Sequence, residues 1–243
     1  MPIASGWHVA PSRLALRSGE VDVWALDVAC PAHELPRLEA ILSFDERARA
    51  SRFRLDRDRS RFIRVRSGLR TLIGSYLGVH PADVAFEYGT HGKPMLGGGY
   101  ESSLKFNVSH SDGVALIAIS HGVEVGIDVE AIRPMADADQ IAARFFSPRE
   151  KAELRGLPSA SFFTCWTRKE AYLKARGHGL AQELRAFTVT VSSGVPPVVV
   201  DHDEEGEGER WSVHDLPALP GYAAALVTRG NPLRVRYHAG PPG

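Results

Sequence analysis

Two acidic residues close together give the first indication of chemistry in this chain. Asp128 and Glu130 lie in the segment Gly126–Glu130, where apolar residues alternate with other types as in a β-strand that has one apolar face. A period of two places both carboxylates on the opposite face of the strand. Adjacent like charges repel, so the pair calls for a cation, a proton or open water.

A second group of chemically capable residues follows about forty positions later in a strongly helical segment. Trp166, Glu170 and Lys174 are four residues apart and therefore share one helix face. If the helix brings Glu170 to the strand pair, three carboxylates form a hard-oxygen site suited to a magnesium ion that also holds phosphates. The alternative is a solvated strand pair beside an ordinary salt bridge between Glu170 and Lys174.

Arginine is concentrated in one region, with ten arginines between Arg47 and Arg70. The arginine fork binds two phosphate oxygens at once. Three interpretations stay open: solvated helix faces, a nucleic-acid surface, or a site for a small phosphorylated ligand. No aromatic stacking set or nucleic-acid motif accompanies the arginines, which argues against nucleic acid as a partner. The carboxylate cluster slightly favours the phosphorylated ligand, because it would supply the metal that such a ligand uses.

Composition limits the class of protein. The chain has 243 residues, 44% hydrophobic content and a formal net charge of zero, enough apolar material for one large domain or two small ones. It contains no apolar run of membrane-spanning length, and Met1–Gly19 lacks the pattern of a signal peptide. Cys30 and Cys165 form no metal-binding motif. We therefore expect a cytoplasmic protein with no membrane partner.

The elements that position these residues are predicted from periodicity and caps. Before residue 120 the pattern indicates a long helix over 58–77, ended by Gly78, and the following further elements: a helix over 33–42, a helix after Ser43, and strands over 21–28, 84–88, 104–111 and 114–119. Ser120–Gly122 is short and polar, and is the expected boundary between an N-terminal half, residues 1–120, and a C-terminal half, residues 121–243.

The second half repeats this order loosely, as a strand, helices and then strands. Ser147 and Glu150 have the spacing of a capping box, and Gly177 ends the helix that carries Glu170. The predicted elements are helices over 138–145 and 159–176 and strands over 126–130, 187–191, 198–200, 211–214 and 222–227. The Pro- and Gly-rich tail beyond Gly230 is expected to fray.

Taken together, these motifs resemble the Sfp-type 4′-phosphopantetheinyl transferases. The resemblance covers residues 40 to 192 and keeps the order and approximate spacing of the family's motifs. It is carried by the segments Gly92–Pro94, Asn107–Ser111, Gly126–Glu130, Phe145–Glu150 and Trp166–Lys174. The fold that the resemblance implies is α+β, with two similar, pseudo-duplicated halves. Each half is a helix packed on a small antiparallel sheet, and the active site lies in the cleft between them.

The activity implied by the resemblance is a magnesium-dependent transfer. Coenzyme A is the co-substrate, its 4′-phosphopantetheine group passes to a serine of an apo acyl or peptidyl carrier protein, and adenosine 3′,5′-bisphosphate leaves. The carrier belongs to fatty-acid, polyketide or nonribosomal peptide synthesis, and the sequence does not select among them. A monomer is expected. The competing interpretation is a phosphate- or nucleotide-binding module without catalysis.

The resemblance also implies roles for individual residues. Asp128, Glu130 and Glu170 match the family's magnesium residues, and Asp128, Glu170 and Lys174 are the expected catalytic residues. Either Glu170 or a water that it positions accepts the serine proton. The expected coenzyme contacts are Arg49, Arg61, Lys93, Ser109, His110, Lys169 and Lys174. The family's first long helix carries basic residues where this chain has a mixture of acidic and basic ones, so only Arg49 is carried over from that stretch.

Overall fold

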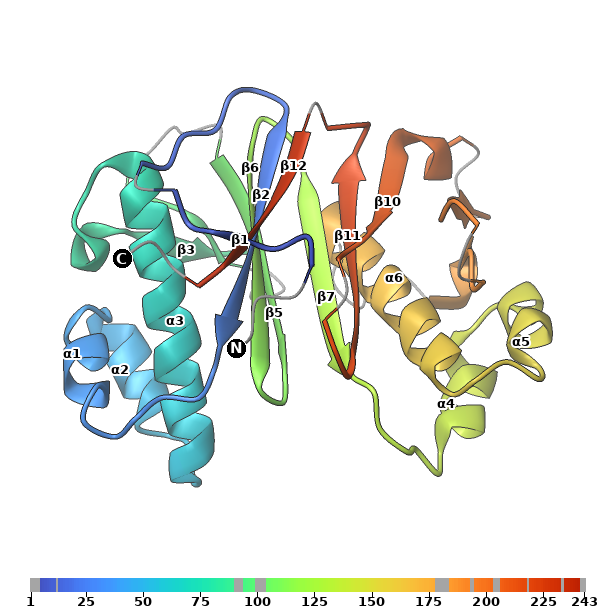
Figure 1. Cartoon of the computed structure of the whole chain (residues 1–243), viewed down its shortest axis with the longest axis horizontal. Helices are drawn as coiled ribbons and strands as arrows, with labels where there is room; N and C mark the ends of the chain where they lie inside the picture. Colours follow the sequence, from blue (N-terminus) through green and yellow to red (C-terminus); the bar gives the residue numbers. More distant parts are fainter. Residues whose placement is uncertain are drawn as a thin grey trace.

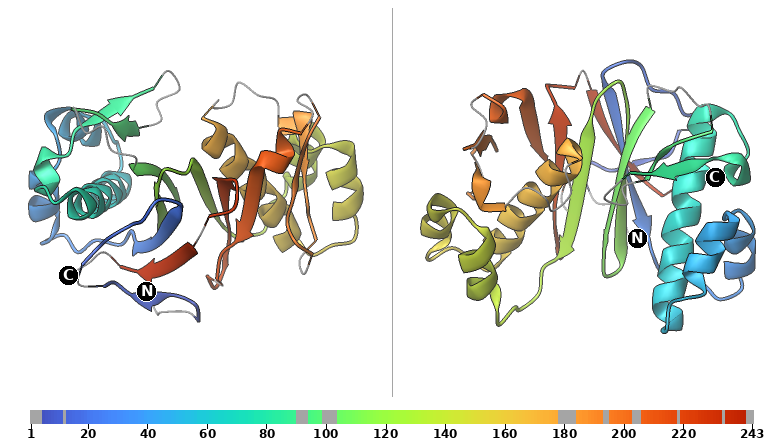
Figure 2. Two further views of the ribbon diagram at one scale, coloured as in Figure 1. Left: turned by 90° about the horizontal axis from the view of Figure 1, so that it is seen from above. Right: turned by 180° about the vertical axis from the view of Figure 1, so that it is seen from behind.

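Strands occupy the middle of the molecule, and helices lie at both ends (Figure 1). Views from above and from behind show the same arrangement (Figure 2). The computed structural model describes residues 5–11, 13–89, 94–98, 104–177, 184–192, 195–202, 206–217, 219–232 and 234–240. The predicted α+β class is confirmed. Among the described helices, none combines the length and the apolar character needed to cross a membrane.

The larger sheet belongs mainly to the first half of the chain. Its order is β1 (His8–Val9), β12 (Arg234–Ala239), β2 (Glu20–Asp27), β6 (Val114–His121) and β5 (Leu104–Ser111). β6 is antiparallel to both β2 and β5. All residues of β6 except His121 are buried, as expected for a continuous apolar strand at the centre of a sheet.

One helix of the first half, α3 (Asp56–Leu77), covers one face of this sheet. The shorter helices α1 (Leu35–Ala40) and α2 (Phe44–Ala50) pack against α3. Leu69, Leu72 and Ile73 of α3 pack into a core with residues of β2 and β6, which confirms the apolar stripe predicted for this helix. Gly78 ends α3 with a left-handed backbone, φ 69°. A short 3₁₀ turn, Pro81–Asp83, and the hairpin of β3 (Phe86–Tyr88) and β4 (Pro94–Leu96) follow.

The smaller sheet belongs to the second half. Its order is β10 (Trp211–Asp215), β11 (Tyr222–Arg229) and β7 (Val125–Ala131), all antiparallel. The helix α6 (Ala160–Arg176) packs against β7 and β11, with α4 (Ala138–Phe145) and α5 (Pro148–Leu154) beside it. Ser147 and Glu150 form the predicted capping box at the start of α5. The remaining elements are β8 (Phe187–Val189), β9 (Val199–Asp201) and the 3₁₀ turns Leu184–Ala186 and Gly208–Arg210.

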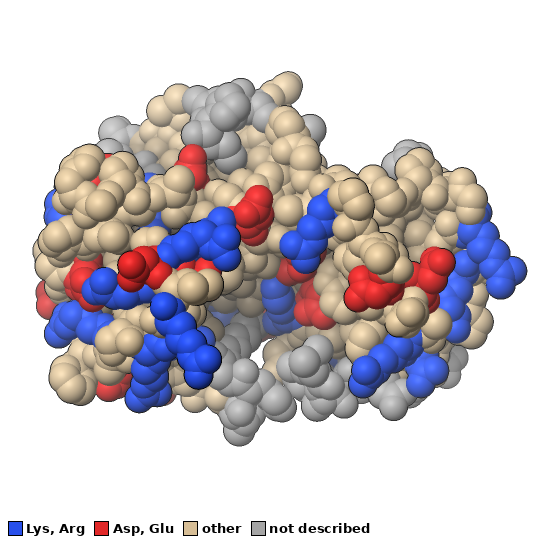
Figure 3. All heavy atoms as spheres, turned by 90° about the horizontal axis from the view of Figure 1, so that it is seen from below, with Lys and Arg blue, Asp and Glu red and all other residues tan. Residues whose placement is uncertain are grey.

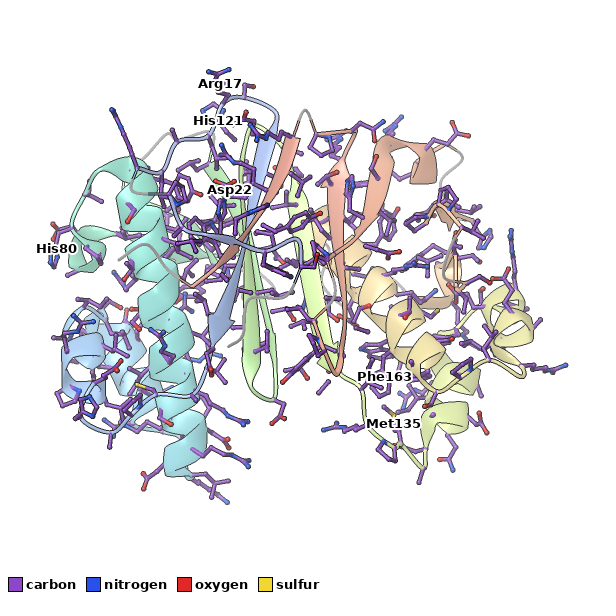
Figure 4. All side chains as sticks on the ribbon, viewed as in Figure 1. Arg17, Asp22, His80, His121, Met135 and Phe163 are labelled. Atoms are coloured by element: carbon purple, nitrogen blue, oxygen red, sulfur yellow. The ribbon has the colours of Figure 1, made fainter. Side chains whose placement is uncertain are left out.

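The expectation that the tail frays beyond Gly230 is wrong. Arg234–Ala239 forms β12, which lies between β1 and β2 and runs parallel to both. Buried Asp22 of β2 holds this strand, because it accepts hydrogen bonds from Arg236 at 2.6 Å and 3.0 Å and contacts His238 at 3.2 Å. Figure 4 shows Asp22 among the side chains between α3 and the sheet. The Pro and Gly residues that flank this strand concealed its period of two.

The last strand therefore joins the sheet of the first half. The division at residue 120 stays a prediction.

Gly126 decides how closely α6 approaches β7. A Cβ atom on Gly126 would lie 2.1 Å from the Ala171 carbonyl oxygen and 2.3 Å from the Ala175 nitrogen, both of them backbone atoms of α6. Only glycine permits this approach, because backbone atoms within a helix do not move aside independently. The same close packing brings the Asp128 and Glu130 face of β7 toward α6.

Substituting Gly126 by Ala is therefore expected to destabilise the protein by at least about 1–3 kcal/mol, because α6 must shift away from β7. Gly68→Ala in α3 is the matched control. A Cβ there meets only the end of the Leu26 side chain at 2.7 Å, and alanine favours the helix by about 1 kcal/mol. Urea unfolding measures both variants. Equal loss of stability in the two would contradict the close-packing argument.

Candidate active site

The two sheets meet edge to edge through side chains. β5 is the edge of the larger sheet and β7 the edge of the smaller one. Alternate side chains of β5 accept hydrogen bonds from alternate backbone amides of β7, at a constant offset of 20 residues. The bonds run from Ile127 N to Asn107 Oδ1 (2.9 Å), from Val129 N to Ser109 Oγ (3.4 Å) and from Ala131 N to Ser111 Oγ (3.1 Å). We call these three bonds the polar ladder.

A pocket of about 890 Å³ opens where β5, β7, α4 and α6 meet. From below, the surface is hollowed between the two halves, and acidic and basic side chains lie in the hollow (Figure 3). The described residues that line the pocket are Val108, Ser109, His110, Asp128, Glu130, Arg144, Phe145, Trp166, Glu170, Lys174, Leu184 and Arg185. Six of them are residues that the sequence analysis singled out for the site.

Asp128 lies at the centre of the polar contacts. The alternative of a solvated strand pair is wrong for Asp128, because α6 and β5 cover it and it is only 3% exposed. Its Oδ1 atom accepts hydrogen bonds from Ser109 Oγ and from Lys174 Nζ, both at 2.7 Å. Lys174 of α6 thus bonds to Asp128 of β7. The alternative interpretation paired Lys174 only with Glu170 of its own helix. No described residue donates a hydrogen bond to the buried Oδ2 atom of Asp128.

Two further carboxylates in the pocket, Glu130 and Glu170, have raised pKa values. Burial, and then the charge of Asp128, raise the pKa of Glu170, while Lys174 opposes the shift. Burial also raises the pKa of Glu130, with Asp128 contributing in the same direction and the Ser111 hydrogen bond, 2.9 Å long, opposing. For Glu130 and Glu170, burial and the neighbouring carboxylates thus outweigh the cations that act on them.

The donor set fits a divalent cation. Carboxylate oxygens are the ligands that magnesium prefers, and the buried Oδ2 of Asp128 has no hydrogen bond that such an ion would displace. In the part of the chain that the structure describes, no three acidic or histidine side chains already stand at metal-binding separations. The carboxylates of Asp128, Glu130 and Glu170 therefore share the pocket without forming a closed cage.

His110 lines the pocket from the first half, and Arg61 lies near it without lining the pocket. Partial burial lowers the pKa of His110, and the charges of Lys174 and Arg61 lower it further, while the side chain keeps an exposed surface. Arg61 of α3 forms an ion pair with Asp112 at 3.1 Å, just beyond the end of β5. Together with Lys174, these residues place positive charge and a hydrogen-bonding ring beside the carboxylates, as a phosphate group requires.

The structure places Lys169 away from the expected coenzyme contacts. Its side chain is completely buried against α5 and β8 and does not line the pocket. Its amine donates to Glu150 Oε1 at 2.7 Å, to Glu150 Oε2 at 2.8 Å and to the Phe187 carbonyl at 2.8 Å, which uses all three of its hydrogens. Lys169 and the capping residue Glu150 thus form a buried ion pair that joins α6, α5 and β8.

The remaining predicted contacts lie in different places. Arg49 lines a second pocket, of about 670 Å³, beside Phe53 and Tyr88, and its guanidinium lies 5.4 Å from the centre of the Phe62 ring. Lys93 is outside the described residues. Ser109 lines the main pocket, but its hydroxyl is bonded to Asp128, Lys174 and the backbone of β7.

Sequence reasoning missed one end of the pocket. Phe145 and Trp166 form an apolar wall there, with ring centres 5.9 Å apart and an edge-to-face arrangement. Arg144, whose guanidinium lies 5.0 Å from the centre of the Phe145 ring, and Arg185 add positive charge. Trp166 shares a helix face with Glu170 and Lys174, which was the available signal.

Comparison with known proteins places this site in a family. The family model described as 4′-phosphopantetheinyl transferase, N-terminal, matches residues 30–122, and the model described as 4′-phosphopantetheinyl transferase superfamily matches residues 124–227. The chain is 46% identical to the 4′-phosphopantetheinyl transferase HetI of Nostoc sp., over 92% of this chain and 94% of that protein. It is 31% identical to the 4′-phosphopantetheinyl transferase psf-1 of Bacillus pumilus, over 86% and 88% of the two chains.

The chain therefore belongs to the 4′-phosphopantetheinyl transferase family, and the Sfp-type resemblance is confirmed. A solved holo-[acyl-carrier-protein] synthase from Thermotoga maritima covers 44% of this chain and 63% of its own, at 26% identity and a TM-score of 0.37, which is too low to support a structural argument.

The buried position of Lys169 leads to a stability prediction. Lys169→Ala leaves the Glu150 carboxylate buried without its cation, which is expected to cost about 3–5 kcal/mol of unfolding free energy. Coenzyme affinity of the folded fraction should not change. Lys105→Ala is the control, because its ion pair with Glu124 is exposed and is worth about 0–1 kcal/mol. A Lys169→Ala protein with parental stability and weaker coenzyme binding would contradict this prediction and show that Lys169 contacts the coenzyme.

The raised pKa of Glu170 predicts a pH-dependent stability in metal-free buffer. The folded pKa lies above the ordinary value of 4.5, so the folded state binds the proton more tightly than the unfolded state does. The unfolding free energy therefore falls as pH rises from 4.5 through the folded pKa. Glu170→Gln should be more stable than the parent protein at pH 7.5, and the difference should vanish below about pH 4.5.

The control for this measurement is Glu124→Gln, which changes an exposed glutamate and should shift stability by no more than about 0.5 kcal/mol. A Glu170→Gln protein that is less stable than the parent at pH 7.5 would contradict the proposed charge imbalance.

Proposed function

We propose that this protein transfers the 4′-phosphopantetheine group of coenzyme A to a serine of an apo acyl or peptidyl carrier protein, with magnesium held in the main pocket. Membership of the 4′-phosphopantetheinyl transferase family supports the reaction type. The observation that carries the assignment of the site is the convergence of six predicted residues from three elements on one pocket: Ser109, His110, Asp128, Glu130, Glu170 and Lys174.

We further propose that the fold consists of two similar halves with the active site in the cleft between them. In support, α3 packs on the sheet of the first half, and α6 packs on β7 and β11 of the second. The pocket takes residues from β5 on one side and from β7, α4 and α6 on the other. The two family-model matches meet near residue 123, which supports the proposed boundary near residue 120, and β12 returns from the second half to the sheet of the first.

The two ends of the pocket bind different parts of coenzyme A. His110, Lys174 and Arg61 bind and orient the phosphates of coenzyme A, through charge and hydrogen bonding. Phe145 and Trp166 pack against the pantetheine arm and exclude water beside the reacting phosphorus. Asp128, Glu130 and Glu170 are the residues that would hold magnesium. When bound, the ion neutralises charge on the pyrophosphate and polarises the phosphorus under attack.

The transfer exchanges one phosphorus–oxygen bond for another. The serine oxygen of the carrier attacks the pyrophosphate phosphorus that bears the pantetheine arm, and the bond from that phosphorus to the bridging oxygen breaks. Adenosine 3′,5′-bisphosphate departs with the bridging oxygen and its electron pair. Lys174 stabilises this developing charge. Glu170 accepts the serine proton, directly or through a water that it positions.

The partners follow from this reaction: coenzyme A and an apo carrier protein, with no nucleic acid and no membrane. A monomer in the cytoplasm is the proposed state.

The direct test incubates the protein with coenzyme A, magnesium and several apo carriers, and reads the carrier mass. We expect the mass of one phosphopantetheine group to be added to the carrier serine. Glu170→Gln should reduce turnover by at least about a hundredfold, because it removes the proton acceptor and a metal ligand. Glu124→Gln is the exposed control and should retain parental turnover.

A non-catalytic phosphate- or nucleotide-binding module is the competing function. It predicts coenzyme binding by calorimetry with no change in the mass of any carrier, and that result would overturn the transferase assignment. Equal turnover for Glu170→Gln and the parent protein would be consistent with the transferase activity. It would show that Glu170 of α6 is not a catalytic residue.

A further inference from the structure

We propose that Ser111 is a positioning residue for the reaction, because its hydroxyl fixes the carboxylate of Glu130 toward the metal. This inference rests on the proposed function, which makes Glu130 a magnesium residue. Ser111 does not line the described part of the pocket, and the resemblance to the family assigns it no role. The same strand gives Asp128 an equivalent partner, Ser109, two residues earlier.

The hydrogen-bond capacity of a serine determines this geometry. A hydroxyl donates one hydrogen and accepts through its lone pairs. Ser111 Oγ accepts from the Ala131 amide at 3.1 Å, so its single hydrogen is available to Glu130 Oε2, 2.9 Å away. The Ala131 amide of β7 thus sets the position of the Ser111 hydroxyl, and the hydroxyl sets the position of the Glu130 carboxylate.

Ser109, two residues earlier on β5, has the same arrangement of hydrogen bonds. Its oxygen accepts from the Val129 amide and from the Lys174 amine, and its hydrogen points to Asp128 Oδ1 at 2.7 Å. Oδ1 is therefore occupied, and Oδ2 is the oxygen left without a hydrogen bond. By analogy, the Ser111 bond engages Oε2 of Glu130 and leaves Oε1 for a cation.

Asn107, the first β5 residue of the polar ladder, orients no carboxylate. Asn107 Oδ1 accepts from the Ile127 amide at 2.9 Å, which is the same support for β7. The neighbouring face position on β7 is Gly126, which has no side chain to orient. Asn107 therefore separates the two effects of the polar ladder, because its loss weakens the junction of the sheets without releasing a carboxylate.

Partners that orient metal-binding carboxylates typically change metal affinity or activity by 10–100-fold when they are lost. The test compares Ser111→Val with Ser111→Thr, two variants of equal size of which only threonine keeps the hydroxyl. Asn107→Ala is the control for a weakened junction. Metal affinity is measured by calorimetric titration of each folded protein with magnesium, and independently by the magnesium concentration that gives half-maximal carrier modification.

Ser111→Val should bind magnesium about tenfold more weakly than the parent and need about tenfold more for half-maximal activity, whereas Ser111→Thr should restore both values. Asn107→Ala should melt at a lower temperature with the parental magnesium response. Equal magnesium affinity in Ser111→Val and Ser111→Thr would overturn the inference, as would an Asn107→Ala response that matches Ser111→Val. A parent protein that transfers the group without magnesium would instead refute the metal part of the proposed function.

Discussion

The structure depends on how two sheet edges are joined without a shared main-chain ladder. An exposed edge presents unpaired amides, which a protein must cover or pair. Here Asn107, Ser109 and Ser111 of β5 accept the hydrogen bonds of alternate β7 amides, so the two halves meet through side chains. Because the serines also bond Asp128 and Glu130, the junction that joins the halves also orients the carboxylates of the pocket.

Much of the frame was predictable because its determinants are local. The helix over 58–77 and its end at Gly78, the capping box at Ser147, and the helix of Glu170 and Lys174 follow from periodicity and end signals within a few residues. The shared face of Asp128 and Glu130 follows from the period of a strand. The approach of that strand to α6 was only a hypothesis, and the glycine that permits it, Gly126, is explained by packing that the sequence does not display.

The misses share a physical cause, which is dependence on distant partners. β12 was missed because its burial depends on Asp22, more than two hundred residues earlier in the chain. Lys169 shares its motif with Glu170, but one residue turns the helix by about 100°, which directs Lys169 away from the pocket and toward Glu150. The burial of Asp128 was left open, because strand periodicity identifies a face and not what covers that face. Each of these features needs a tertiary contact to specify it.

The polar ladder is the central claim, and amide hydrogen exchange at β7 tests it most directly. In a strand, alternate amides point to opposite sides, so those of Ile127, Val129 and Ala131 face β5, and those between them face β11. We predict slow exchange for both sets, and selective acceleration at Ile127 in the Asn107→Ala protein. Rapid exchange at Ile127, Val129 and Ala131 in the parent protein, with the intervening amides still protected, would show that β7 is an open edge and would contradict the account.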